Sequence, residues 1–158
     1  MSRSFYDSVT VGMIQELGSH TFERNEIIEF ASDFDPQRFH LSDEGAADSH
    51  FGKLCASGWH TCSVWMRLNV ANGRNEFIRA TGYEGPEPVF GPSPGLRNVK
   101  WTHPVYVGDT ITYSSTVTAK RKTPKRPGWG MIMNHSTGVN QDGVQVMQMD
   151  GAVTLRVD

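Results

Sequence analysis

Residues 57–73 read SGWHTCSVWMRLNVANG, and this stretch decides the fold. Ser57 or Gly58 can begin a helix, and the Asn72-Gly73 pair is a typical signal for a helix end. The apolar residues spread around the helical cylinder instead of forming one narrow stripe, which predicts a largely buried helix. The stretch therefore predicts a long central helix that the rest of the chain must cover.

The residues after this helix have the pattern of β-strands. Strands are predicted over residues 96–103, 110–120, 131–140 and 144–157, and Asp142-Gly143 predicts a two-residue hairpin turn between the last two. Residues 82–95 are rich in Gly and Pro and are predicted to be irregular. These patterns favour an α+β fold in a single domain of residues 1–158, with an antiparallel sheet wrapped around the central helix.

The first part of the chain predicts a strand and two helical segments. Residues 9–22 favour a strand interrupted at Gly12 and Gly18, and Asn25 is a candidate N-cap for a helix over residues 26–31. Pro36 disfavours helical geometry at Asp35, so residues 33–40 should form a loop. One or two helical turns are expected within residues 43–50.

Composition narrows the class of protein. The chain has 158 residues, of which 37% are hydrophobic, and its formal net charge is −2. The charge gives no reason to expect nucleic acid as a partner, and no apolar run approaches the roughly 20 residues of a membrane span. The first residues lack the apolar stretch of a secretory signal. We therefore expect a cytoplasmic protein with no membrane partner.

The spacing of the cysteines and histidines argues against a disulfide and against a zinc site. Cys55 and Cys62 would lie ~10 Å apart on one predicted helix, which is too far for a disulfide, so we interpret both as small core residues. The six histidines and two cysteines show no ligand spacing typical of zinc.

A carboxylate and an imidazole lie close together in the predicted loop. Asp35 and His40 could hold one water molecule between them, although such residues are more often a turn former and a surface histidine. Gly58 adds a second feature, because the backbone amides at a helix start are unpaired and favour negative charge. A Gly there would let a thioester carbonyl approach closely, or would simply relieve packing.

The motifs DPQRFHL (residues 35–41), FG (51–52) and ASG (56–58) together resemble the signature of MaoC-like dehydratases and (R)-specific enoyl-CoA hydratases. The resemblance extends to residues 21–30, 101–110 and 140–143, and therefore covers nearly the whole chain. It implies a hotdog fold and a homodimer or higher homo-oligomer. Arg38 stands where the family usually has Pro, and we favour a solvent-facing side chain for it.

The resemblance implies roles for individual residues. Asp35 and His40 would be catalytic, and the Gly58 amide would bind the thioester carbonyl. Gln37, Ser57, Trp59 and His60 are candidates for substrate binding, although a structural role is favoured for Trp59 and His60. Enoyl-CoA hydration or 3-hydroxyacyl-CoA dehydration is the implied reaction, with an acyl-CoA thioester as the substrate. No metal and no further cofactor are implied, because CoA is part of the substrate.

Two other functions remain open. A hotdog acyl-CoA thioesterase is one alternative, but residues 58–74 contain no carboxylate of the kind that many of those enzymes place on the central helix. The second is a non-catalytic acyl-CoA binding protein, which would have no chemical need for both Asp35 and His40. The basic residues within 120–126 could contact CoA phosphates, but we favour a solvated hairpin loop. Residues 82–95 are a candidate cap for the pocket.

Overall fold

The computed structural model describes residues 3–158, which form a five-stranded antiparallel sheet in the order β1-β3-β4-β5-β2. The strands are β1 (Ile14–Thr21), β2 (Leu96–Trp101), β3 (Thr110–Lys122), β4 (Trp129–Val139) and β5 (Gln145–Arg156). The helices are α1 (Phe5–Ser8), α2 (Arg24–Phe34), α3 (Asp43–Ala47), α4 (Gly58–Leu68) and α5 (Arg74–Ala80). The predicted α+β architecture of a sheet with a central helix is confirmed.

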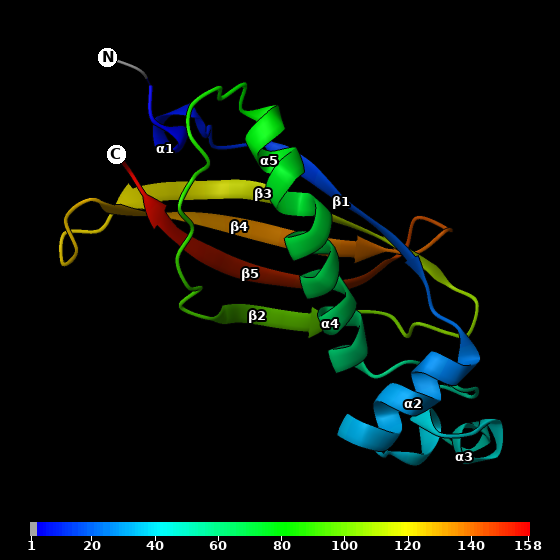
Figure 1. The fold of residues 1–158 in the computed structure, drawn as a ribbon. Helices are drawn as coiled ribbons and strands as arrows, with labels where there is room; N and C mark the ends of the chain where they lie inside the picture. The colour runs from blue at the N-terminus through cyan, green and yellow to red at the C-terminus, as the bar shows by residue number, and fades with distance from the viewer. Residues whose placement is uncertain (1–2) are drawn as a thin grey trace.

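The central helix runs across one face of the sheet (Figure 1). It begins at Gly58 as predicted, with Ser57 as its N-cap. Its predicted end at Asn72-Gly73 is wrong, because a π-helical turn, η2 (Asn69–Gly73), joins α4 directly to α5. Gly73 has an ordinary helical φ of −60°, and a Cβ there would lie 2.6 Å from Leu17 Cδ2. This glycine therefore serves the close packing of the helix on β1.

The N-cap of the second helix and the loop of the last hairpin differ from the predictions by one or two residues. Helix α2 begins at Arg24, and its N-cap is Glu23, which forms a capping box with Glu26, so the Asn25 N-cap was wrong. The last hairpin closes with a 2.9 Å hydrogen bond from the Asn140 amide to the Val144 carbonyl, which leaves three residues in the loop instead of two. Gly143 takes the left-handed position of this loop, with φ of +78°.

The core lies between the central helix and the sheet. Trp65 is buried there, whereas the next residue, Met66, is 45% exposed. Both cysteines are buried and free, as predicted, although Cys55 lies before the helix, in a bridge to Tyr106. Among residues 3–158, no helix combines the length and hydropathy that crossing a bilayer requires.

Candidate active site

Asp35 and His40 are brought together by the loop that follows α2. Asp35 is the C-cap of that helix, Pro36 follows it, and the chain then forms a single 3-10 turn, η1 (Arg38–His40). The Cys55 amide donates to the Phe39 carbonyl at 3.2 Å and ties this loop to the segment that leads into α4. The predicted loop is thereby fastened beside the start of the central helix.

The hydrogen bonds of His40 determine which of its ring nitrogens carries a proton. His40 is 5% exposed, and its Nδ1 lies 2.7 Å from the carbonyl oxygen of Cys55. A carbonyl can only accept, so Nδ1 must donate. In the neutral ring Nε2 therefore has a free lone pair, and it faces Asp35 Oδ2 at 3.4 Å. The imidazole is thus oriented as a proton acceptor beside a carboxylate.

The Asp35 carboxylate is held by two other side chains. Gln37 Nε2 donates to Oδ1 and the Ser57 hydroxyl donates to Oδ2, each at 2.7 Å. Burial opposes ionisation of Asp35, but the hydrogen bonds from Ser57 and Gln37 and the charge of His40 together outweigh it and lower the pKa of the carboxyl. Asp35 is therefore a fixed carboxylate at neutral pH.

Gly58 is the first residue of α4, where backbone amides have no partner within the helix. Its missing side chain is a packing requirement, because a Cβ would lie 2.4 Å from the Trp101 indole ring. Trp101 and Trp59 meet edge to face, with centroids 5.1 Å apart. The packing interpretation of Gly58 is thus supported, and it is compatible with an amide that is free to bind a carbonyl oxygen.

One pocket of about 390 Å³ collects these groups. Asp35, His40 and Gly58 line it, and Gln37 and Trp59 extend its wall. Ser57 is fully buried behind it and acts through Asp35. Burial, followed by the charge of Asp35, raises the pKa of Cys55 to about 11, so this thiol in the pocket wall stays protonated and is a poor nucleophile.

His60 is not among the residues that line this pocket. It is 6% exposed and stacks on Phe30 with centroids 4.6 Å apart, while Phe22 meets its ring edge to face. The substrate-binding interpretation of His60 therefore gives way to the structural one. Trp59 and His60 differ because consecutive residues of the helix face different elements. Trp59 faces β2, whereas His60 faces α2.

The wall residues that were not proposed as site residues from the sequence include Phe39, Phe51, Cys55 and Trp101. Three of them lie inside or beside the motifs quoted above, so their positions carried a signal. Trp101 could be assigned to the pocket only once the sheet order placed β2 beside the start of α4.

Three other features of the sequence lie outside the candidate site. Lys120 donates to the carbonyls of Tyr6 and Val9 at 2.9 and 2.8 Å, so it fastens the N-terminal segment to β3. Arg38 is exposed at the start of η1, in agreement with the solvent-facing interpretation. Phe90, Ser93 and Gly95 from the irregular segment line a second cavity instead of the Asp35 pocket.

Comparison with known proteins finds a matching family model and a relative that covers almost the whole chain. Residues 8–128 match the family model described as a MaoC like domain. The uncharacterized protein YdeM of Bacillus subtilis (strain 168) is 25% identical over 150 residues, which cover 95% of this chain and 97% of that protein.

Solved structures agree with this match. The MaoC-like dehydratase from Rhodospirillum rubrum is 30% identical, with a TM-score of 0.80 and 96% of each chain covered. The R-hydratase PhaJ1 from Pseudomonas aeruginosa is 19% identical, with a TM-score of 0.68 over 99% of this chain and 88% of that one, and this likeness concerns the fold.

Proposed function

Because this chain belongs to the MaoC-like domain family, we propose that it is a hydro-lyase that adds water to a 2-enoyl-CoA thioester or removes it from a 3-hydroxyacyl-CoA. The observation that carries the proposal is the 3.4 Å approach of His40 Nε2 to Asp35 Oδ2 in a pocket that Gly58 also lines. The names of a dehydratase and an R-hydratase among the similar structures support the same reaction class.

The proposed reaction begins with a water molecule held by both side chains. His40 Nε2 accepts a proton from this water, and Asp35 Oδ2 accepts a hydrogen bond from it. The water oxygen then forms a bond to C3 of the enoyl group, and the electrons of the double bond move toward the thioester carbonyl. Transfer of the proton from His40 to C2 completes the 3-hydroxyacyl product and restores the neutral imidazole, and the reverse sequence removes water.

The start of the central helix would stabilise the charge that develops during this step. The Gly58 amide would donate to the carbonyl oxygen as it becomes enolate-like, aided by the positive end of the helix dipole. One donor of this kind typically contributes about 3–4 kcal/mol to the transition state. This proposal requires neither a metal nor a cofactor other than the CoA of the substrate.

The assembly and the compartment remain predictions from the resemblance and the sequence. A homodimer or higher homo-oligomer is expected, and a monomeric mass by light scattering would contradict it. A cytoplasmic location is likewise an expectation.

The proposed function is tested by hydration of crotonyl-CoA, followed through the loss of absorbance of the enoyl thioester. Asp35→Asn and His40→Ala should each lower kcat by at least about a hundredfold, because each removes one partner of the water. Asp33→Asn and His50→Ala are matched controls at exposed positions on the neighbouring segments. Turnover like that of the wild type in either site variant would remove the proposed roles.

A further inference from the structure

The indole of Trp101 covers the start of the central helix at Gly58. A Cβ on Gly58 would lie 2.5 Å from Trp101 Cδ2 and 2.5 Å from its Nε1. That Cβ position is itself about 2.5 Å from the Gly58 nitrogen in standard backbone geometry, so these two ring atoms lie within about 5 Å of that nitrogen. The ring therefore stands beside the amide that the proposed function assigns to the thioester carbonyl.

The neighbours of Trp101 hold this ring in place. Trp101 is the last residue of β2. The next residue, Thr102, donates from its amide to the Val146 carbonyl at 2.9 Å and from its hydroxyl to the Gln145 carbonyl at 2.8 Å. The Trp59 ring meets the Trp101 indole edge to face, with centroids 5.1 Å apart. The indole is therefore anchored through its own strand and packed against the first turn of the helix.

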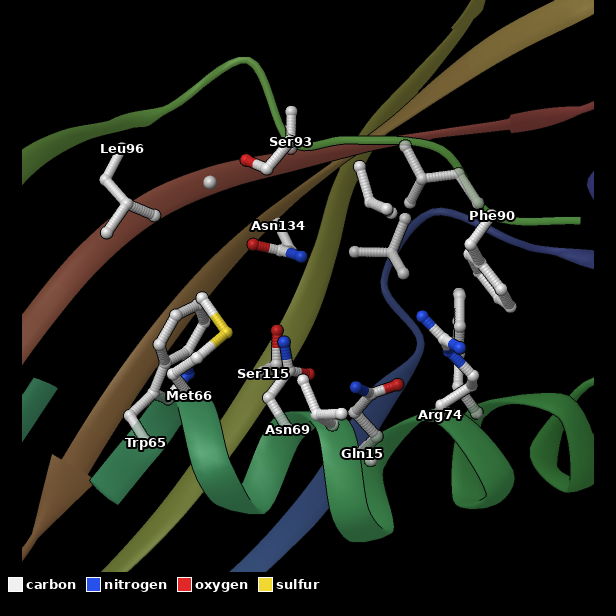
Figure 2. Close-up of a pocket in the computed structure, with 18 of the residues that line it drawn as sticks. Gln15, Trp65, Met66, Asn69, Arg74, Phe90, Ser93, Leu96, Ser115 and Asn134 are labelled. Carbon is white, nitrogen blue, oxygen red and sulfur yellow. The ribbon is translucent and has the colours of Figure 1, made fainter. Parts of the chain in front are cut away.

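The two ends of β2 line different cavities. Leu96, at its start, lines the cavity of about 450 Å³ between the far half of the central helix and the sheet (Figure 2). Trp101, at its end, instead lines the pocket that contains Asp35, His40 and Gly58. Trp101 is 45% exposed, so a molecule that enters this pocket can touch the ring.

The acyl carbon next to the carbonyl would lie as close to the Gly58 amide as the ring does. A carbonyl oxygen bound by that amide lies about 2.9 Å from the nitrogen, and bond lengths then place the acyl C2 carbon about 5 Å from it. Ser57, which precedes Gly58, donates to Asp35 Oδ2 at 2.7 Å, so the carboxylate is held near the same amide. A substituent on C2 would therefore share a small space with the catalytic pair and with the indole.

We propose that Trp101 determines specificity at the acyl C2 carbon and disfavours thioesters that carry a substituent there, an inference that rests on the function proposed above. An unbranched 2-enoyl group has a single hydrogen at C2 and fits beside the ring. A methyl group at C2 would overlap the indole or pull the carbonyl oxygen away from the Gly58 amide. One methyl or methylene group in an apolar pocket changes kcat/KM by about 10- to 200-fold.

The test compares the hydration of crotonyl-CoA with that of its 2-methyl form, tiglyl-CoA. Trp101→Leu should raise the kcat/KM for tiglyl-CoA relative to that for crotonyl-CoA by at least about tenfold over the wild-type ratio, and Trp101→Phe should raise it less. The intrinsic reactivities of the two thioesters are the same in every variant, so the change in the ratio reports the ring. Trp129→Leu makes the same chemical change on β4, outside this pocket, and should keep the wild-type ratio.

Binding of saturated thioesters gives a readout that does not depend on catalysis. In titration calorimetry the wild-type protein should bind propanoyl-CoA about tenfold more tightly than 2-methylpropanoyl-CoA. Trp101→Leu should bind the two with affinities that differ by about threefold or less.

A hydration ratio that stays at the wild-type value in both Trp101 variants would overturn the inference, and so would equal wild-type affinities for the two saturated thioesters. Trp101→Phe keeps an aromatic ring on β2, so it tests the indole even if Trp101→Leu does not fold. Crotonyl-CoA hydration separates the two proposals. Hydration without discrimination against the C2 methyl group overturns the role of Trp101 alone, whereas discrimination in binding without hydration overturns the proposed function. A protein that binds none of these thioesters would overturn both.

Discussion

Ser57 donates a 2.7 Å hydrogen bond to Asp35 Oδ2 and accepts one of 3.2 Å from the backbone amide of Trp59. A single hydroxyl therefore caps the central helix and fixes the carboxylate of the candidate site. Ser57 is fully buried, so water does not compete for either bond. The start of the helix and the position of Asp35 are consequently one structural unit.

Replacement of Ser57 by Ala should affect both halves of this unit. Loss of the N-cap should lower the free energy of unfolding by about 1 kcal/mol. Loss of the hydrogen bond should raise the pKa of Asp35, because that bond favours the ionised form. The acid limb of the kcat/KM profile for crotonyl-CoA should then shift to higher pH. Ser57→Thr keeps the hydroxyl, so its acid limb should lie at the wild-type pH. An acid limb that does not shift in Ser57→Ala would show that Ser57 does not control the ionisation of Asp35.

The lowered pKa of Asp35 also predicts a pH dependence of stability. Burial works against the ionised form, but the bonds from Ser57 and Gln37 and the charge of His40 leave the folded pKa below that of the unfolded chain. The folded state therefore gains stability above the unfolded pKa of about 3.9 and loses it as the pH falls through the folded value. Denaturant titrations should show Asp35→Asn less stable than the wild type at pH 7, with the gap narrowing below about pH 4. A constant gap would contradict this linkage.

The local signals of the sequence located the two halves of the candidate site. Pro36 placed a loop at Asp35, and Ser57-Gly58 placed the helix start, because each is a short-range effect of backbone geometry. The helix end could not be placed in this way. Gly73 resembles a C-cap, but its lack of a side chain is needed for contact with Leu17, a residue far away in the sequence.

The position of His60 could not be predicted either, because it also depends on contacts with residues far away in the sequence. His60 follows Trp59 directly, yet its neighbours Phe22 and Phe30 come from segments about 30 residues earlier or more, so only the tertiary structure places it in the core. The cavity between the far half of the central helix and the sheet could not be found from the sequence either, because its wall combines residues from several strands and a π-helical turn.

Gly58→Ala should destabilise the protein through contact with Trp101. Without this contact, Ala would favour the helix over Gly. With the indole 2.4 Å from the new Cβ, we expect a cost of about 1–3 kcal/mol in the free energy of unfolding. In a Trp101→Ala background the same change should be neutral or stabilising, which a double-mutant cycle measures by denaturant titration. An equal cost in both backgrounds would show that the indole is not the reason for the glycine.

His60 makes the fold sensitive to mild acid. Burial lowers the pKa of His60 to about 4, the charge of Glu26 opposes this shift, and His20 and Arg67 add to it. In the unfolded chain an ordinary histidine titrates near pH 6.5, so between about pH 6.5 and 4 the unfolded state binds more protons and folding becomes less favourable. The loss approaches about 3 kcal/mol at the acid end of that window. His60→Phe should remove this slope while preserving the stack on Phe30, so the denaturation midpoint of the variant should fall less steeply than that of the wild type. Parallel curves for the two proteins between pH 6.5 and 4 would mean that another group governs the acid sensitivity.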